Sequence, residues 1–165
     1  MNRTEKAEKY KILFVCLGNI CRSPTAEGVM AGLVRDAHLE SRIEIDSAGT
    51  YGGHAGELPD ARMRQHASRR GYNLTSRSRQ VRVSDFEEFD LIVAMDDRNY
   101  ENLRDLAPDL ESQAKVHRMV EYGKQTTYDY IPDPYYGGAD GFELVLDLLE
   151  DTCDGLLNDI KMNIL

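Results

Sequence analysis

The sequence contains few cysteines, no long apolar run and no excess of positive charge. Three cysteines among 165 residues do not suggest the disulfide framework of a secreted protein. The polar start MNRTEKAEKYK has no signal-peptide core, and no apolar run reaches the roughly 18 residues that a membrane-spanning helix needs. We therefore expect a protein of the reduced cytoplasm.

The charge balance argues against two classes of partner. The formal net charge is −9 and the pI is near 4.9. Nucleic acids and anionic membranes both attract basic surfaces, so we expect neither as a partner. An anion-binding site in this chain would have to be a local positive feature on a negative background. The sequence also contains no recognisable set of metal ligands, and we expect no cofactor.

Short apolar segments alternate with helical patterns along the chain. The apolar segments predict strands at residues 12–15, 43–46, 90–95 and 116–120. The helical patterns predict helices at 24–37, 59–70, 141–158 and between Asp96, as N-cap, and Pro108. This alternation predicts one α/β domain, a doubly wound parallel sheet with helices on both faces. We place this domain at residues 10–165, after a disordered polar leader at 1–9.

One loop joins the first predicted strand to the first predicted helix. It consists of Cys16, Leu17, Gly18, Asn19, Ile20, Cys21 and Arg22. Ser23 and Pro24 follow, a pair that suits a helix start, with Ser23 as the cap. A loop that enters a helix N-terminus directs several backbone N–H groups into one concavity, which suits an anion. Arg22 adds a planar fork of donors for two phosphate oxygens, and the same field favours the thiolate of Cys16.

The loop therefore combines a nucleophile with a phosphate cradle, although other interpretations exist. A cysteine and an arginine six positions apart occur by chance in many proteins, and Cys16 could simply be a buried residue that ends a core strand. The preceding strand, the internal Gly and Asn and the following Ser-Pro favour the functional interpretation. A nucleotide-binding P-loop is disfavoured, because the segment has one glycine and no lysine.

Two blocks of the sequence resemble the low-molecular-weight protein tyrosine phosphatases. The run VCLGNICRSPTAE resembles the phosphate-binding loop of that family. Asp133-Pro134-Tyr135-Tyr136-Gly137 resembles its general-acid loop and lies 117 positions after Cys16 (133 minus 16). The resemblance covers the chain from about Tyr10. It implies the strand order 2-1-3-4 and the hydrolysis of phosphotyrosine and other aryl phosphate monoesters through a cysteinyl-phosphate intermediate.

The resemblance also implies a role for each reacting residue. Cys16 attacks phosphorus, while Arg22 and the loop amides hold the three non-bridging oxygens. Asp133 protonates the departing phenolate and then accepts a proton from the water that hydrolyses the intermediate. Because Asp133 has to be protonated while Cys16 is ionised, we expect a rate maximum below neutrality. Ser23 could hydrogen-bond the sulfur and make it a better leaving group.

Further residues are expected to support the loop. The resemblance implies that Ser47 hydrogen-bonds Asn19 and holds the loop rigid. Glu27 could belong to the same network, or it could be a first-turn carboxylate that complements the helix N-terminus. Ser76 replaces a histidine that some relatives use to support the loop asparagine. Cys21 could form a regulatory disulfide with Cys16, or it could fill space under the loop.

The cleft wall departs from the family pattern at one position. Gly53 stands where family members commonly carry an aromatic residue that supports the substrate ring, and Tyr51 could replace that residue from two positions earlier. His54 is expected to line the cleft without a catalytic role. On the other side, Tyr135 and Tyr136 resemble the family's cleft wall and sites of phosphorylation.

Two rival functions are weaker. A thioredoxin-linked arsenate reductase needs a relay of further cysteines, and the chain has none between Cys21 and Cys153. A non-catalytic phosphopeptide-binding module would usually have lost Cys16 or Asp133, and both are present. The expected partner is a tyrosine-phosphorylated protein, with a bacterial tyrosine kinase as one candidate.

Overall fold

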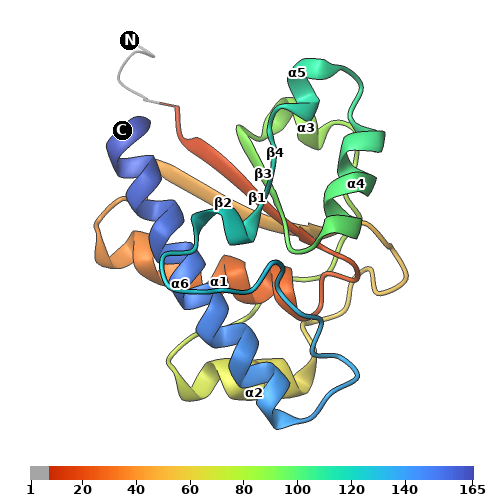
Figure 1. Ribbon diagram of the computed structural model, residues 1–165, viewed down its shortest axis with the longest axis vertical. Helices are drawn as coiled ribbons and strands as arrows, with labels where there is room; N and C mark the ends of the chain where they lie inside the picture. The colour runs from red at the N-terminus through yellow and green to blue at the C-terminus, as the bar shows by residue number, and fades with distance from the viewer. Residues whose placement is uncertain (1–7) are drawn as a thin grey trace.

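A four-stranded parallel sheet forms the centre of the computed structural model, which describes residues 8–165 (Figure 1). The strands are β1 (Tyr10–Cys16), β2 (Ile43–Gly49), β3 (Leu91–Ala94) and β4 (Val116–Arg118). Their order is β2-β1-β3-β4, and each neighbouring pair is parallel. The predicted order 2-1-3-4 is confirmed. Residues 1–7 of the predicted leader lie outside the described residues.

Helices cover both faces of the sheet. The described helices are α1 (Arg22–Asp36), α2 (Ala61–Arg69), α3 (Asp85–Glu88), α4 (Asp97–Leu106), α5 (Leu110–Gln113), the 3₁₀ helix η2 (Met119–Tyr122) and α6 (Ala139–Asn163). Helix α2 packs against α6 rather than against the sheet. Figure 1 shows α1 and α6 on one face and α3, α4 and α5 on the other. The predicted doubly wound arrangement is therefore confirmed.

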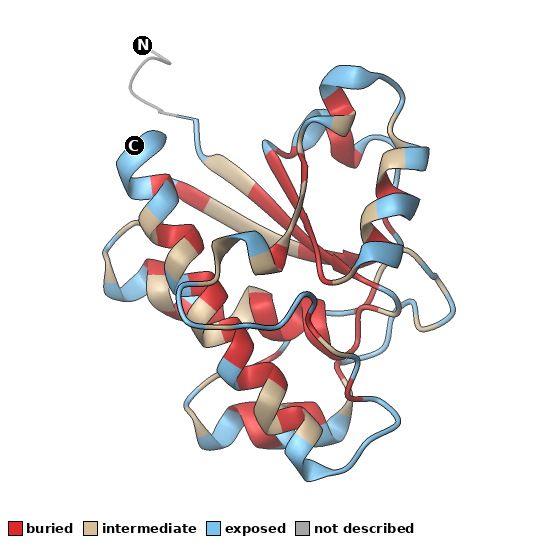
Figure 2. Cartoon of the chain, in the orientation of Figure 1, coloured by how far each residue is buried: buried red, intermediate tan, exposed pale blue. Residues whose placement is uncertain are grey.

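Strand β1 shows why two faces are needed. Successive side chains of a strand point to opposite faces, so Ile12 and Phe14 pack with α1 and α6, whereas Leu13 and Val15 pack with α3 and α4. All four side chains have no exposed surface. Figure 2 shows the same pattern, with buried residues along the middle of the sheet and exposed ones on the outer helix surfaces. A central strand that is apolar and buried from Ile12 to Cys16 requires cover on both sides.

Several element boundaries differ from the sequence-based expectation. The strand predicted at 116–120 ends at Arg118, because Met119–Tyr122 turns into the 3₁₀ helix η2. The helix predicted at 141–158 is longer and runs from Ala139 to Asn163. The short helices α3 and α5 were not predicted, since four residues are too few for a helical repeat to be visible.

Within residues 8–165, no helix is long and apolar enough to cross a membrane.

Two features of the fold place the functional site. Strand β1 ends at Cys16 and β3 ends just before Met95 and Asp96, so both chain segments leave the sheet at the same edge. Helix α6 then packs along α1 and brings the residues that precede it, including Asp133, to that edge. Ligands of open parallel sheets bind at this carboxyl edge.

The packing of α6 yields a stability prediction. Leu149 of α6 has no exposed surface and packs against α1 and the sheet. Leu149→Ala should lower the free energy of unfolding by about 3 kcal/mol, because it removes buried methyl groups and leaves a cavity. Urea denaturation measures the change. The matched control is Leu110→Ala, at a side chain 81% exposed, with an expected change below about 0.5 kcal/mol. Equal losses in both variants would contradict the packing described here.

Candidate active site

The loop from Cys16 to Arg22 directs its carbonyl groups outward. Surrounding segments donate to four of them: the N–H groups of Thr50, Tyr51 and Asp60 bond the carbonyls of Cys16, Leu17 and Ile20 at 3.0, 2.8 and 2.8 Å. The Ser78 hydroxyl donates to the Gly18 carbonyl at 2.9 Å. Within residues 8–165, the N–H groups of residues 17–22 have no acceptor. The predicted cradle of inward-facing donors is therefore present, at the N-terminus of α1.

Two backbone features allow this tight loop. Asn19 adopts a left-handed conformation with φ 57°, which asparagine tolerates better than most residues. Gly49, the last residue of β2, lies directly against the loop. A Cβ at this position would be 2.6 Å from the Leu17 carbonyl oxygen and 3.1 Å from the Asn19 nitrogen. Only a glycine lets the end of β2 approach so closely.

Cys16 lies at the base of the loop with its sulfur against Ser23. The Cys16 Sγ to Ser23 Oγ distance is 3.0 Å, and the Ser23 N–H donates to the same sulfur at 3.5 Å. The prediction that Ser23 caps the helix is wrong. Helix α1 already begins at Arg22, Cys21 occupies the N-cap position, and Ser23 lies inside the first turn. Its hydroxyl is free of capping and faces the sulfur, as the functional interpretation expected.

A buried polar network supports Asn19. The Asn19 side-chain amide donates to Ser23 Oγ at 2.7 Å and to Ser47 Oγ at 3.0 Å, so the predicted contact with Ser47 is present. The Arg79 N–H donates to Asn19 Oδ1 at 3.0 Å. Every polar atom of the Asn19 side chain therefore has a partner in a chain that carries Ser76 rather than a histidine.

Glu27 belongs to this network. The Ser47 hydroxyl donates to Glu27 Oε1 at 2.6 Å, and Ser76 also contacts the Glu27 carboxyl group. Burial raises the pKa of Glu27 above its ordinary value, while the hydrogen bond from Ser47 opposes the shift. The alternative in which Glu27 complements the helix N-terminus is wrong, since α1 starts at Arg22 and Glu27 lies beyond its first turn.

Arg22 is held from one side and open to the cleft on the other. Its Nη1 donates to Asp96 Oδ2 at 2.7 Å and to the Ile131 carbonyl at 3.1 Å. Its Nη2 lies 3.7 Å from Asp133 Oδ2. Burial by itself lowers the pKa of Arg22, but the Cys16 sulfur and the Asp96 carboxylate outweigh this effect and raise it. The guanidinium therefore stays charged although its side chain is only 3% exposed.

Asp96 was predicted only as a helix cap, and that prediction is confirmed, since its Oδ1 accepts the Asn99 N–H at 2.8 Å. Its contact with Arg22 was missed. A signal existed in the strand order: β1 and β3 are parallel neighbours, so the residues after Val15 and after Ala94 meet at one edge. The Ile131 contact had no such signal, because it depends on the path of a loop.

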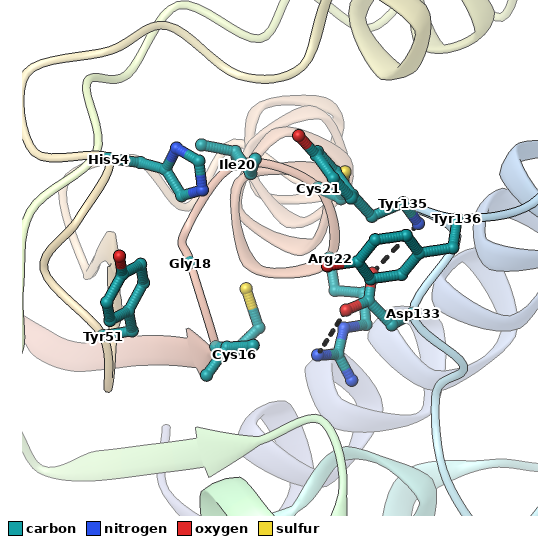
Figure 3. A pocket seen from close by; sticks show the side chains of 11 residues that line it. Cys16, Gly18, Ile20, Cys21, Arg22, Tyr51, His54, Asp133, Tyr135 and Tyr136 are labelled. Atoms are coloured by element: carbon teal, nitrogen blue, oxygen red, sulfur yellow. Dashed lines mark hydrogen bonds and ion pairs between the residues drawn. The ribbon is translucent and has the colours of Figure 1, made fainter.

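Figure 3 shows the cleft above Cys16 and its two walls. Tyr51 and His54 lie on one side, and Asp133, Tyr135 and Tyr136 lie on the other. The remaining lining residues belong to the loop: Leu17, Gly18, Ile20, Cys21 and Arg22. The structure thus brings the residues predicted for the cleft together. His54 contacts Glu57 rather than a reacting group, with 3.2 Å between its Nδ1 and Glu57 Oε1.

Tyr51 occupies the space that an aromatic residue at position 53 would need. A Cβ built on Gly53 would lie 2.1 Å from the Tyr51 ring, so the two positions cannot both carry a side chain in this arrangement. The Tyr51 and His54 rings are in edge contact, with 6.0 Å between their centroids. The wall that Gly53 cannot supply is therefore supplied by Tyr51, two residues earlier in the chain.

The three cysteines are free thiols in different surroundings. Cys21 is 4% exposed, and burial together with the charge of Asp60 strongly raises the pKa of its thiol. Cys153 is fully buried against α1, and burial raises the pKa of its thiol in the same way. The predicted place of Cys153 in the core is confirmed.

In the described part of the chain, no group of three or more His, Cys, Asp or Glu side chains could hold a metal ion.

These differences predict selective labelling of Cys16. Iodoacetamide at about pH 7 should modify Cys16 first, because it alone faces the cradle of donors, while the raised pKa values keep Cys21 and Cys153 protonated and unreactive. Inorganic phosphate should slow the reaction by occupying the loop. Peptide mass spectrometry over time measures each site, with Cys16→Ser as the control. Modification of Cys21 as fast as that of Cys16 would contradict this account.

Comparisons with known proteins agree with the geometry. Residues 11–164 match the family model described as low molecular weight phosphotyrosine protein phosphatase. A low molecular weight protein-tyrosine-phosphatase of Streptomyces coelicolor is 44% identical over 154 residues, which cover 92% of this chain and 94% of the relative.

Solved structures agree in the same way. A protein tyrosine phosphatase of Entamoeba histolytica has a TM-score of 0.92 and 45% identity, covering 95% of this chain and 100% of its own. A Drosophila arginine phosphatase has a TM-score of 0.86 and 31% identity, and the match covers 93% of this chain and 99% of that one. The phosphate cradle, the two-walled cleft and these similarities together lead to one conclusion: the chain belongs to the low-molecular-weight phosphotyrosine protein phosphatase family.

Proposed function

We propose that Cys16, Arg22 and Asp133 hydrolyse the phosphate monoester of phosphotyrosine in a protein substrate, without a metal ion or cofactor. The observation that carries the proposal is the convergence of three kinds of group on one cleft. The sulfur of Cys16 lies at its base, the N–H groups of residues 17–22 and the Arg22 guanidinium surround it, and the Asp133 carboxyl group faces it from the side. Family membership makes the chain a protein-tyrosine phosphatase.

In the first step the Cys16 thiolate attacks phosphorus in line with the ester oxygen. An S–P bond forms, the P–O bond to the tyrosine ring breaks, and Asp133 transfers its proton to the departing phenolate oxygen. The loop N–H groups and Arg22 Nη2 hold the three non-bridging oxygens, whose charge they stabilise throughout. Arg22 Nη1 cannot move toward the phosphate without leaving Asp96 and Ile131, so the guanidinium is already oriented.

In the second step water attacks the cysteinyl-phosphate. Asp133, now a carboxylate, accepts a proton from the water, the new P–O bond forms, and the S–P bond breaks. The electron pair returns to the sulfur, where the Ser23 hydroxyl, 3.0 Å away, and the Ser23 N–H stabilise the departing thiolate. Inorganic phosphate then leaves, and the enzyme is regenerated.

The cleft also supports an aromatic leaving group. Tyr51 and His54 on one side and Tyr135 and Tyr136 on the other form an aromatic slot of the kind that holds a phenyl ring. Phosphotyrosine-containing proteins are therefore the substrate class. Within it, we propose a tyrosine-phosphorylated protein of the cytoplasm as the partner, with a bacterial tyrosine kinase as one candidate. A reduced compartment suits this site because the nucleophile has to remain a thiolate.

The two rival functions lose support. An arsenate reductase of the thioredoxin-linked type needs a relay of further cysteines in a mobile segment. The chain has none between Cys21 and Cys153, and Cys153 is fully buried against α1. A silent binding module would bind phosphotyrosine without turnover, which an activity assay distinguishes directly.

The deciding experiment is hydrolysis of p-nitrophenyl phosphate and a phosphotyrosine peptide across pH. The rate should pass through a maximum below pH 7, because Asp133 has to carry a proton while Cys16 lacks one. Cys16→Ser should have no measurable turnover, and Asp133→Ala should lose about 10²–10³-fold with the peptide, since a general acid contributes rates of this order. Acid quenching should trap a phosphoenzyme in the wild type and none in Cys16→Ser.

Three results would overturn the proposal. The first is binding of phosphotyrosine without turnover, which would indicate a binding module. The second is full activity of Cys16→Ser. The third is faster hydrolysis of phosphoarginine than of phosphotyrosine, which the similarity to the Drosophila arginine phosphatase makes the relevant competitor. The third result requires the same assay with phosphoarginine as an additional substrate.

The unusual wall yields a separate prediction. Tyr51→Ala should raise KM for phosphotyrosine peptides about fivefold and leave kcat within twofold, because the ring contributes binding surface but touches no reacting atom. Tyr128→Ala is the matched control, since Tyr128 is also partly exposed but does not line the cleft. Steady-state kinetics measures both variants. An unchanged KM in Tyr51→Ala would show that the ring does not contact the substrate.

A further inference from the structure

Arg62 lies in the first turn of α2, between the phosphate loop and the loop that carries Asp133. Figure 1 shows α2 beside the N-terminal end of α6 and the segment that leads into it. The Arg62 guanidinium lies 4.9 Å from the centre of the Phe142 ring of α6 and 5.5 Å from that of Tyr135. Its Nη2 donates to the Tyr135 carbonyl at 3.0 Å.

On its other side, Arg62 is tied to the phosphate loop through Asp60. Arg62 Nε and Nη2 bind the two Asp60 carboxylate oxygens at 3.1 and 2.9 Å, a bidentate pair. The Asp60 N–H in turn donates to the Ile20 carbonyl at 2.8 Å, and its Oδ1 caps α2. The position of the guanidinium is therefore set by the same loop that holds the phosphate.

The segment that carries Asp133 has few other hydrogen bonds, although Pro134 within it is buried. Its internal hydrogen bonds run from the Tyr135 N–H to Asp133 Oδ1 at 3.0 Å and from Gly137 to Pro134. Among the described residues, the bond from Arg62 to the Tyr135 carbonyl is the only hydrogen bond that reaches residues 132–137 from outside that segment. The Asp133 side chain is exposed. Its Oδ2 faces the Arg22 guanidinium, with 3.7 Å between Oδ2 and Nη2.

We propose that Arg62 is a positioning residue that holds Tyr135, and through the Tyr135 N–H the Asp133 carboxyl group, over the phosphate loop. The inference rests on the proposed function, because it concerns proton transfer by Asp133. A planar guanidinium suits the task, since it binds Asp60 through two atoms, donates to a carbonyl and stacks on rings at the same time. Without this bridge the acid loop loses its hydrogen bond to the rest of the enzyme.

The dependence of the rate on the leaving group tests the inference. Arg62→Gln should lower kcat/KM for phenyl phosphate about tenfold, because phenolate is a poor leaving group that needs a well-placed acid. It should change kcat/KM for 2,4-dinitrophenyl phosphate less than twofold, because that phenolate leaves without a proton. A loss that is equal for both substrates, or no loss, would overturn the inference.

A double-mutant cycle separates positioning from a general structural effect. In an Asp133→Ala background, Arg62→Gln should change kcat/KM for phenyl phosphate less than twofold, because the group through which Arg62 acts is absent. A further tenfold loss would show that Arg62 acts elsewhere and would overturn the inference. Arg69→Gln, at an exposed position of the same helix, is the matched control for loss of one positive charge and should stay within twofold of the wild type.

Two further measurements keep the outcome clear. Thermal melting shows whether each variant is folded at the assay temperature, and Arg62→Lys, which keeps the charge but lacks the planar fork, takes the place of Arg62→Gln if that variant is unfolded. Arg62→Lys should then show the same selective loss with phenyl phosphate. A wild type that hydrolyses neither substrate would instead refute the proposed function itself, before Arg62 is considered.

Discussion

The carbonyl groups of Cys16, Leu17, Gly18 and Ile20 form hydrogen bonds to segments outside the phosphate loop, and the rest of the site depends on this arrangement. Buried backbone groups have to be paired, so a loop can turn its N–H groups toward a ligand only when its carbonyls find donors elsewhere. The donors come from the end of β2, from Asp60 before α2 and from Ser78. Three segments far apart in sequence therefore hold one loop in an anion-binding shape.

Arg22 adds a charge that has to be balanced within the protein. A guanidinium that is only 3% exposed is costly unless carboxylates and carbonyls surround it, and here Asp96, Asp133 and the Ile131 carbonyl do so. The two Arg22 nitrogens differ in their contacts: Nη1 donates to Asp96 and to the Ile131 carbonyl, whereas Nη2 faces the cleft. The same contacts join the N-terminus of α4 and the acid loop to the phosphate loop. A local positive site is thus maintained in a chain with a net charge of −9.

Much of the fold and site could be predicted because both depend on contiguous segments. The run from Ile12 to Pro24 contains a buried strand, a glycine-containing loop and a helix start, so its shape follows from local rules. The predictions for Ser23 and Glu27 failed in part because both assumed where α1 begins. A shift of two residues turned Ser23 from a cap into a partner of the sulfur. Helix ends are set by the packing of neighbouring segments, which local propensity does not contain.

The sequence by itself determined the order of strands and helices along the chain, the anion-binding character of the loop from Cys16 to Arg22, and the candidate acid Asp133, 117 positions after Cys16 (133 minus 16). These follow from periodicity, from the chemistry of Cys, Arg and Asp, and from a family pattern that spans the chain. Only the tertiary structure decided that Tyr51 fills the space above Gly53, that the Arg79 backbone supports Asn19 and that Arg62 links the two loops. Each of these is a contact between loops. Loop paths are set by close packing against distant residues, and no local pattern encodes them.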